Sequence, residues 1–328
     1  MNLEKLPRIP LACLPTPVEE LPRLSRELGG PRLWVKRDDQ TGLATGGNKT
    51  RKLEFLLADA LAQGADAVVT AGAAQSNHCR QTAAAAARLG LACTLLLGGE
   101  PPHSPGGNLL LDYLLGAQIR WTGPRRRGEQ LEEIAEELRV AGHRPYLIPY
   151  GGSNAVGAVG YVAAMQELSG QLAAKKLAVD RIIIASSSGG THAGLAVGAR
   201  LVGFGGQIVG IGIDKGEAGD EPYPVHLAHL ANSTARHIGL DTVFTPADFV
   251  VNPDYLGGGY GVVGASEREA IRLAARLEGL LLDPVYTGRA LGGLIDMIRR
   301  GVIGHDETLL FWHTGGTPAL FAYADELV

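Results

Sequence analysis

Gly46-Gly47-Asn48-Lys49-Thr50-Arg51-Lys52-Leu53-Glu54 places a lysine directly between a glycine pair and a segment with helical periodicity. Glycines let the backbone turn sharply and approach a ligand closely. Apolar residues then recur at the spacing of one buried helical face, at Leu53, Leu56, Leu57, Ala60 and Leu61. Because a helix N-terminus disfavours positive charge, a partly desolvated amine there loses its proton more readily and can attack an aldehyde. The alternative for Lys49 is a solvated surface lysine.

The composition is that of a globular protein without a basic excess. The chain has 328 residues, of which 45% are hydrophobic and 20% charged, and its formal net charge is -4. This length predicts one large domain or two closely joined domains. The charge argues against nucleic-acid partners, and no run approaches the roughly 20 apolar residues of a membrane span.

Two features of the chain predict a cytoplasmic protein. The start, Met1-Asn2-Leu3-Glu4-Lys5-Leu6-Pro7, lacks the hydrophobic segment of a secretory signal. The three cysteines, Cys13, Cys79 and Cys93, are an odd number without short paired spacing. This pattern argues against a disulfide framework and a cysteine-rich metal site, and we expect Cys79 to be a buried, inert thiol.

Strand and helix signals alternate along most of the chain. Expected strands lie at 33–37, 67–70, 92–97, 118–121, 146–148, 181–185, 207–213 and 308–312. Expected helices lie at 108–115, 130–140, 191–202, 222–238, 266–278 and 288–300. Three further helices are expected: one that begins at Lys49, an alanine-rich one that ends at Arg88, and one from Asn154 to about Leu172. Strands separated by helices predict an α/β protein with parallel sheets covered on both faces. A weak glycine-rich signal suggests a domain boundary near residues 150–160.

Ser186-Ser187-Ser188-Gly189-Gly190-Thr191-His192-Ala193-Gly194 lies between an apolar strand and a helix of small residues. Backbone N–H groups and hydroxyls at a positive helix end make this segment a candidate phosphate cradle. It lacks the lysine of a Walker loop and does not match G-x-G-x-x-G, so neither familiar nucleotide motif is present. A simple glycine-rich turn is the other interpretation.

Gln75-Ser76-Asn77-His78 occupies the same kind of strand-to-helix junction. Ser76 and Asn77 are either helix caps alone or donors to a carboxylate or an aromatic oxygen. His78 is a candidate for acid–base chemistry, although no carboxylate or nucleophile stands at motif spacing. We expect no metal site, because His226 and His229 at i, i+3 are typical of a helix surface.

Three late segments combine glycine with polar side chains. They are Gly257-Gly258-Gly259-Tyr260-Gly261, Asp283-Pro284-Val285-Tyr286-Thr287-Gly288 and His313-Thr314-Gly315-Gly316-Thr317-Pro318. The tyrosines are either half-buried packing residues or part of loops that converge on a ligand at strand ends.

Taken together, these motifs resemble the D-cysteine desulfhydrase and 1-aminocyclopropane-1-carboxylate deaminase family over nearly the whole chain. The resemblance implies two domains, each an open, mostly parallel twisted sheet flanked by helices, in the tryptophan-synthase-β-like fold (fold type II of pyridoxal-phosphate enzymes). Residues 1–50 and 161–328 would form a larger cofactor-binding domain and residues 51–160 a smaller one, with the active site in the cleft between them. A homodimer is the expected assembly.

The resemblance also implies the roles of individual residues. Lys49 would form the Schiff base with pyridoxal 5'-phosphate, and Asn77 would contact the ring oxygen. The phosphate would be held by Ser188, Gly189, Gly190 and Thr191, and Asn48 would contribute to cofactor binding. The expected substrate-facing residues are Ser76, Tyr260 and Tyr286.

The branch within the family rests on Thr287 and Thr314. In deaminases these positions are usually glutamate and leucine, so the chain resembles the desulfhydrases. A hydroxyl stabilises the pyridine nitrogen less than a carboxylate does, which suits a substrate with a good leaving group. Thr314 is the first candidate for the ring nitrogen and Thr287 the second.

The expected reaction is therefore α,β-elimination from D-cysteine to pyruvate, ammonia and hydrogen sulfide, with Lys49 as a candidate base. Alternatives on the same fold are L-cysteate sulfo-lyase and 1-aminocyclopropane-1-carboxylate deaminase. An alternative of another class is a non-catalytic pyridoxal-phosphate carrier, which would need Lys49 and the phosphate loop but not the set of Ser76, Tyr260 and Tyr286.

Overall fold

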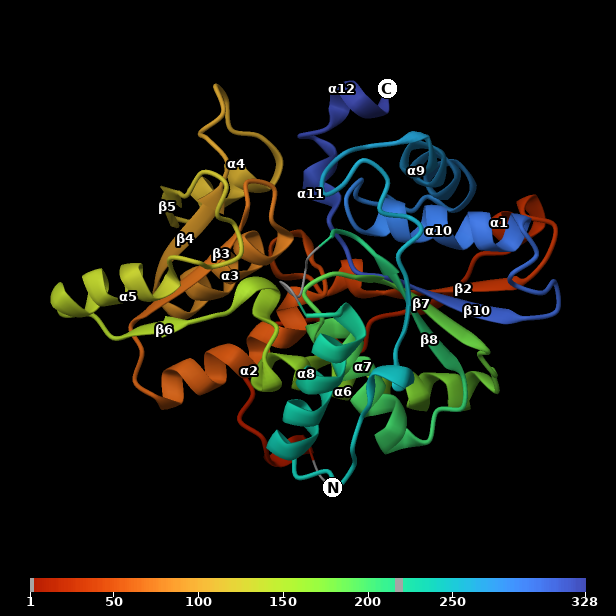
Figure 1. The fold of residues 1–328 in the computed structure, drawn as a ribbon, viewed down its shortest axis with the longest axis horizontal. Coiled ribbons are helices and arrows are strands. Elements are labelled where there is room, and N and C mark those ends of the chain that lie inside the picture. The colour runs from red at the N-terminus through yellow and green to blue at the C-terminus, as the bar shows by residue number, and fades with distance from the viewer. Residues whose placement is uncertain (1–2, 216–220) are drawn as a thin grey trace.

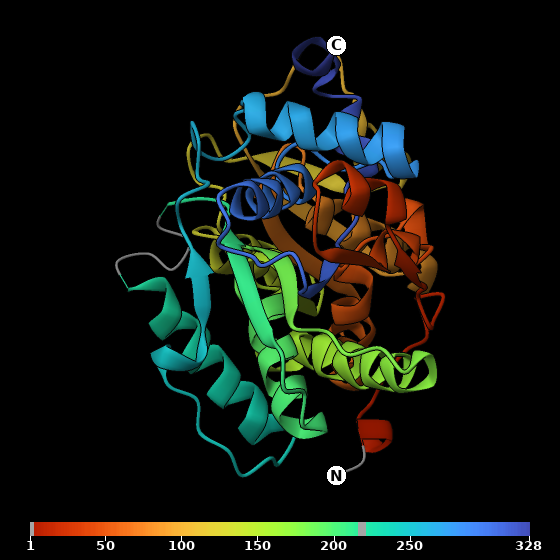
Figure 2. The ribbon, with the colours of Figure 1, turned by 90° about the vertical axis from the view of Figure 1, so that its right-hand side faces the viewer.

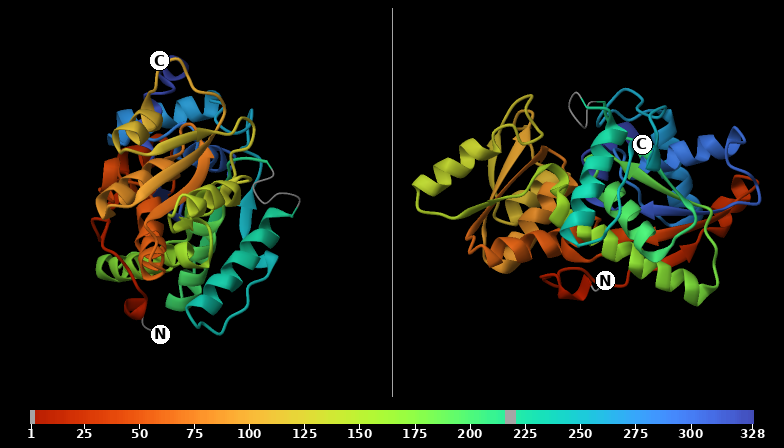
Figure 3. Two further views of the ribbon diagram at one scale, coloured as in Figure 1. Left: turned by 90° about the vertical axis from the view of Figure 1, so that its left-hand side faces the viewer. Right: turned by 60° about the horizontal axis from the view of Figure 1, so that its bottom comes forward.

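Two separate β-sheets, each with helices on both faces, make up the molecule (Figure 1). The computed structural model describes residues 3–215 and 221–328. Figure 3 shows the two sheets in two lobes, with the segment around 65–150 in one and most of the remaining chain in the other. The expected α/β class with mostly parallel sheets is confirmed.

The larger sheet has six strands in the order β1-β2-β10-β7-β8-β9. All neighbours are parallel except β1 and β2. The strands are β1 (Val18–Glu20), β2 (Arg32–Arg37), β10 (Thr308–His313), β7 (Arg181–Ser186), β8 (Gln207–Gly212) and β9 (Val250–Asn252). The central strands read as continuous apolar runs because both faces are buried.

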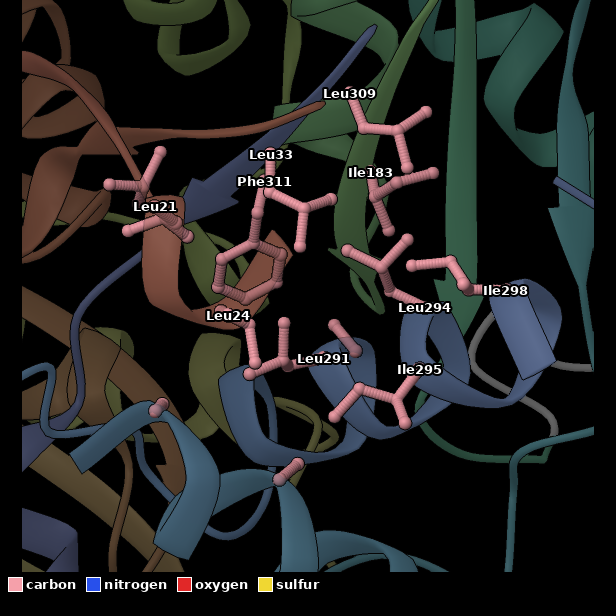
Figure 4. Close-up of a cluster of buried hydrophobic side chains, with 14 of the residues drawn as sticks. Leu21, Leu24, Leu33, Ile183, Leu291, Leu294, Ile295, Ile298, Leu309 and Phe311 are labelled. Carbon is pink, nitrogen blue, oxygen red and sulfur yellow. The ribbon is translucent and has the colours of Figure 1, made fainter. Parts of the chain in front are cut away.

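Helices cover the two faces of this sheet separately (Figure 2). One face packs against α1 (Pro22–Glu27), α9 (Ala265–Glu278) and α10 (Thr287–Arg299), and the other against α6 (Ala155–Lys175), α7 (Gly190–Val202) and α8 (Tyr223–His237). Alternate residues of β10 divide between them, since Phe311 packs with α10 (Figure 4) and Trp312 with α6. Each leucine-sized side chain buried in this way stabilises the fold by roughly 1.5–3 kcal/mol.

The smaller sheet has four parallel strands in the order β5-β4-β3-β6. They are β5 (Gln118–Trp121), β4 (Ala92–Gly98), β3 (Ala67–Ala73) and β6 (Pro145–Leu147). One face packs against α2 (Lys49–Ala62), α3 (Asn77–Leu89) and α4 (Gly107–Leu114), and the other against α5 (Leu131–Val140).

Helix α2 begins at Lys49, as expected, and most of its predicted apolar face is buried. Leu61 is the exception, because 42% of its surface is exposed near the end of the helix. The expectation that Leu61 belongs to the buried face is therefore wrong. Cys79 is fully buried, and burial raises the pKa of its thiol well above the ordinary value, as suits an inert residue.

Short elements complete the described chain. They are the 3-10 turns η1 (Leu3–Lys5), η2 (Asp38–Gln40), η3 (Leu43–Thr45), η4 (Tyr150–Gly152) and η5 (Pro246–Asp248), and the C-terminal helices α11 (Thr317–Leu320) and α12 (Ala324–Leu327). Within the described residues, no helix combines the length and the apolar character needed to span a membrane.

A buried polar cluster anchors the start of α2 to the larger sheet. Arg51 pairs with Asp38 at 2.8 Å and with Glu167 of α6 at 2.9 Å. Tyr161 and Trp312 also donate to Asp38, at 2.6 and 2.8 Å. Burial alone would raise the pKa of Asp38, but Arg51 beside it brings the pKa below its ordinary value. The cluster fixes the helix that carries Lys49 relative to the six-stranded sheet.

All strands of the smaller sheet lie within 51–160 and those of the larger sheet outside this range. Leu11 nevertheless packs into the core beneath the smaller sheet. The sheets thus agree with the predicted division, whereas the domain boundaries themselves stay a prediction.

Candidate active site

A pocket lies at the carboxyl ends of strands from both sheets. Ser76, Asn77 and His78 line it from the junction after β3, and Thr314 lines it from the end of β10. The end of β7 and the segment after it contribute Ala185, Ser186, Ser187, Ser188, Gly189, Thr191 and His192. Lys49, Asn48, Tyr150, Gly151 and Tyr286 complete the lining. Ligands in parallel α/β folds bind at this end of the strands.

Lys49 is the first residue of α2 and lies half-buried in the pocket. One turn later Lys52 is buried, and its Nζ donates to the Gly151 carbonyl and to Ser153 Oγ, both at 3.1 Å. Burial, and then the charge of Lys49, lower the pKa of Lys52 well below its ordinary value. The amines of Lys49 and Lys52 therefore lie close together beside the pocket.

The junction after β7 forms a cradle at the N-terminus of α7. Gly189 caps the helix at φ +89° without a side-chain cap, and a Cβ on Gly190 would lie 2.7 Å from Lys52 Nζ and Ser153 Oγ. Ser153 Oγ accepts from the Gly190 N–H at 3.1 Å and bonds Ser188 Oγ at 2.8 Å. Glycine at these positions keeps the helix end open to a ligand.

The electrostatics of this cradle suit an anion. Helix N-termini carry partial positive charge, and Lys52 adds a buried amine beside them. All residues lining the pocket are described, and none is an aspartate or a glutamate. The donor set therefore matches the phosphate predicted for Ser188, Gly189, Gly190 and Thr191.

Asn48 and Asn77 are oriented by neighbouring polar groups. Asn48 Nδ2 donates to Thr191 Oγ1 at 3.1 Å. Asn77 Oδ1 accepts from Asn108 Nδ2 at 2.8 Å, and Asn108 in turn donates to the Gln75 carbonyl at 2.9 Å. Since the oxygen of Asn77 is already used, its Nδ2 is the atom left to donate to an oxygen in the pocket.

Ser76 caps α3, because its Oγ accepts from the Cys79 N–H at 3.2 Å. The same residue lines the pocket. Capping and ligand contact, the two interpretations of Ser76, are thus compatible in this structure. The helix end next to Ser76 is a second place where negative charge is stabilised.

Tyr260 and Tyr286 meet at the edge of the pocket. Their hydroxyls lie 2.8 Å apart, and only Tyr286 is part of the pocket lining. The guanidinium of Arg126 stacks on the Tyr260 ring at 4.0 Å and donates to the Tyr150 hydroxyl at 3.0 Å. Burial raises the pKa of Tyr260 well above the ordinary value, so its hydroxyl keeps its proton.

The two candidate threonines occupy different surroundings. Thr314 lines the pocket, and its carbonyl accepts from the Asn48 N–H at 3.0 Å. Thr287 is fully buried, and its Oγ1 donates to Asp283 Oδ1 at 2.7 Å and accepts from the Asp283 N–H at 2.8 Å. Thr287 is not among the residues that line the pocket.

Two buried histidines also line the pocket. His78 Nε2 bonds Thr70 Oγ1 at 2.8 Å, and burial, then Lys49 and Lys52, lower the pKa of His78 well below its ordinary value. Burial lowers the pKa of His192 to about 4. Both rings are therefore neutral near pH 7. Among the described residues no cluster of three or more histidine, cysteine or acidic side chains is arranged to hold a metal ion.

Fold and pocket together define a class of enzyme. Residues 9–315 match the family described as "Pyridoxal-phosphate dependent enzyme", and the chain belongs to that family. The chain is also 46% identical to a protein named D-cysteine desulfhydrase from Klebsiella pneumoniae (strain 342), with 99% of each chain covered. A second protein of this name, from Klebsiella pneumoniae subsp. pneumoniae, is equally similar.

Solved structures give the same result. The chain is 41% identical to a structure described as an ACC deaminase homologue, with a TM-score of 0.90 over 99% of this chain and 96% of the other. A threonine deaminase isoform from Solanum lycopersicum, at 18% identity and a TM-score of 0.65, shares the fold over 96% of this chain and 83% of the other. The family, fold and cofactor class predicted from the motifs are confirmed.

The residues present fit pyridoxal phosphate. The open N-terminus of α7 with Lys52 suits its phosphate, and Lys49 provides a pocket amine for its aldehyde. The donor Nδ2 of Asn77 suits its ring oxygen, and Thr314 also lines the pocket.

Several residues of the site escaped the sequence analysis. Tyr150, Ser153 and Arg126 lie outside the motifs quoted above, and Lys52 lies inside the first of them without an assigned role. Lys52 lies one turn from Lys49, and this i, i+3 spacing was the available signal. Arg126 lies about 130 residues from Tyr260, and only the folded structure brings them together.

Proposed function

We propose that this protein is a pyridoxal-phosphate-dependent lyase that converts D-cysteine and water to pyruvate, ammonia and hydrogen sulfide. The observation that carries the proposal is that Lys49, the anion cradle of α7, Ser76 and Tyr286 share one pocket. It is supported by full-length similarity at 46% identity to a protein named D-cysteine desulfhydrase.

The cofactor, when bound, supplies an electron sink that stabilises negative charge at Cα of an amino acid. In this proposal Ser188, Gly189, Gly190 and Thr191 hold its phosphate through hydroxyls and backbone N–H groups. Asn77 donates Nδ2 to its ring oxygen, and Asn48 steadies Thr191. Thr314 is the residue we assign to the ring nitrogen, because Thr287 already uses its hydroxyl on Asp283.

Lys49 has two tasks in the proposed reaction. Its Nζ holds the cofactor before substrate arrives and then accepts the proton from Cα. We assign both tasks to Lys49 because its side chain lines the pocket, whereas Lys52 is directed to Gly151 and Ser153.

The remaining polar groups would bind and orient the substrate. Ser76 and the adjacent N-terminus of α3 receive the carboxylate, since a helix start stabilises negative charge. Tyr286, backed by the Tyr260 hydroxyl at 2.8 Å, donates a proton to the departing sulfur. Loss of sulfide from Cβ leaves an enamine that becomes an imine, and water hydrolyses this imine, so that one molecule each of sulfide, ammonia and pyruvate forms.

The test is product formation by the cofactor-loaded protein from D-cysteine, L-cysteine, L-cysteate and 1-aminocyclopropane-1-carboxylate. We expect sulfide and pyruvate in equal amounts, formed preferentially from D-cysteine. Y286F is expected to lower kcat strongly, whereas Y113F, at a tyrosine 48% exposed on α4, serves as the matched control and should not. Turnover of only another substrate in the panel would refute the assignment to D-cysteine.

We also propose that the protein acts as a homodimer in a reducing compartment. The family expectation supports the dimer. Within the described residues the cysteines Cys13, Cys79 and Cys93 are all free, as a reducing compartment favours. Sedimentation equilibrium of the cofactor-loaded protein tests the assembly, and a monomer at micromolar concentration would contradict it.

A further inference from the structure

The loop that leads into Lys49 has an uncommon backbone. Four consecutive residues have positive φ: Ala44 at 42°, Thr45 at 69°, Gly46 at 71° and Gly47 at 130°. Glycine adopts such angles at little cost, but alanine and threonine do so unfavourably because of their Cβ atoms. A segment of this kind persists only where its surroundings hold it in place.

One buried side chain holds this loop. The guanidinium of Arg80, on α3, donates to the carbonyl of Ala44, to Thr45 Oγ1 at 2.7 Å and to the Gly46 carbonyl at 3.1 Å from both Nη1 and Nη2. Arg80 is fully buried. Its partners thus include both non-glycine residues of this loop that have positive φ.

The next residue of α3 reinforces the same connection. Gln81 Oε1 accepts from the Thr50 N–H and from Thr50 Oγ1, both at 2.8 Å. Thr50 directly follows Lys49, so α3 contacts the chain on both sides of the lysine. The same helix begins with Asn77, and Ser76 is its cap. One rigid element therefore joins the substrate-facing end of the pocket to the loop that positions the lysine.

We propose that Arg80 is a positioning residue that holds the loop 44–47 in its positive-φ conformation. It thereby fixes the position of Lys49 relative to Ser76 and Asn77. This inference rests on the function proposed for Lys49. Arg80 lies outside the pocket lining and acts through the loop.

Arginine is suited to this task for a geometric reason. Its planar guanidinium presents several N–H donors in a fixed fork, whereas lysine has one compact ammonium. Burial lowers the pKa of Arg80 to about 10, so the group is still charged near neutral pH. A lysine at this position cannot reproduce the contact of two separate nitrogens, Nη1 and Nη2, with the Gly46 carbonyl.

The experiment compares R80K with R88K, a matched change at an exposed arginine of the same helix. For R80K we expect kcat for D-cysteine to fall about tenfold or more while KM changes little, and the rate at which the apoprotein forms its visible cofactor band to fall in parallel. R88K should match the wild type in all three quantities. An R80K protein with wild-type kcat and wild-type band formation would overturn the proposal.

A second substitution separates positioning from general stability. A44G removes the Cβ that disfavours φ 42° while leaving the carbonyl in place. In the wild type it should change kcat little, but in R80K it should restore kcat about threefold or more, because the loop then needs less support. If A44G restores only the melting temperature of R80K and not kcat, the proposal is wrong.

Should R80K fail to fold, T45V provides the same test from the loop side. Thr45 is exposed, and its Oγ1 is one of the acceptors of Arg80. We expect T45V to lower kcat and the rate of band formation about two- to tenfold, and an unchanged T45V would contradict the proposal. If the wild type forms the cofactor band but does not turn over D-cysteine, the proposed substrate is wrong. The rate of band formation in R80K and in the wild type would then still test the role of Arg80.

Discussion

Thr314 and Thr287 have different surroundings although both were candidates for the same contact. Thr314 lines the pocket, whereas the hydroxyl of Thr287 both donates to and accepts from Asp283 at the start of α10. Asp283 also accepts from the N–H groups of Val285 and Tyr286. Thr287 thus shapes the turn that presents Tyr286.

Replacing each threonine by valine should separate these roles. T314V is expected to lower kcat about two- to tenfold with an unchanged melting temperature, because only a ligand contact is lost. T287V should lower the free energy of unfolding by about 1–3 kcal/mol, because the buried Asp283 N–H loses its acceptor and Asp283 Oδ1 loses one of its two donors. Chemical denaturation and steady-state kinetics measure both. The reverse pattern would assign the ring contact to Thr287.

At the scale of residues, the sequence predicts groups that belong to a strand-to-helix junction. Ser76, Asn77 and Ser188 to Thr191 all line or border the pocket because junctions after parallel strands converge. Residues whose role depends on contacts with distant parts of the sequence lie in no such motif. Arg80 supports the loop 44–47 only because α3 packs beside it, and its sequence neighbours do not reveal this.

Helix α4 carries a buried acid in an unfavourable setting. Asp112 is fully buried, and neither of its carboxylate oxygens has a hydrogen-bond partner in the described structure. Burial, opposed in part by Arg80, raises the pKa of Asp112 from 3.8 to about 8. The folded protein therefore keeps this proton up to about pH 8, whereas the unfolded chain releases it near pH 4.

The stability contributed at Asp112 should fall as the pH rises between these two pKa values, because the unfolded state loses its proton first. The amide of an asparagine cannot ionise, so D112N should raise the free energy of unfolding at about pH 8 by on the order of 3 kcal/mol and much less at about pH 5. Urea denaturation at the two pH values measures this difference. An equal effect of D112N at both would contradict the raised pKa.

At the scale of elements, the longer helices and strands follow the predicted alternation closely. The expected helix at 191–202, for example, is α7 at Gly190–Val202. Strands β1 and β9 were not expected, because Val18-Glu19-Glu20 and Val250-Val251-Asn252 show too little alternation of apolar and polar residues to be recognised. The helix α1 was also missed, since its proline at the start resembles a loop.

The two lobes contact each other at the mouth of the pocket through charged groups. Arg126 and Arg127, in the loop between β5 and α5, both pair with Asp214, which follows β8 of the larger sheet. Arg126 also contacts Tyr150 and Tyr260. The arginine that contacts both tyrosines is thus paired with an acid of the other sheet's lobe.

We expect D214N to lower kcat/KM for D-cysteine about three- to tenfold by releasing Arg126, with little change in stability because the pair is partly exposed. High salt should reduce the kcat/KM of the wild type toward that of D214N. The control is E269Q, which removes an ion pair with Arg299 far from the pocket. Equal kinetics of D214N, E269Q and the wild type would contradict this role.

At the scale of the whole molecule, sequence patterns predict the class but not the strand order. The sheet places β2 beside β10, so Leu33 pairs with Leu309. No local sequence pattern encodes a contact between residues that are 276 positions apart. Nor does one predict that β1 pairs antiparallel with β2 at the edge of the sheet. The division into a domain of residues 1–50 and 161–328 and a domain of residues 51–160 was predicted only from the family resemblance.

We propose that Lys49, and not the neighbouring Lys52, holds the cofactor. The most direct measurement is borohydride reduction of the cofactor-loaded protein followed by peptide mass mapping. We predict the cofactor mass on Lys49 in the wild type and in K52R, and none on either lysine in K49A. Cofactor attached to Lys52, or to no lysine of the pocket, would contradict the assignment to Lys49.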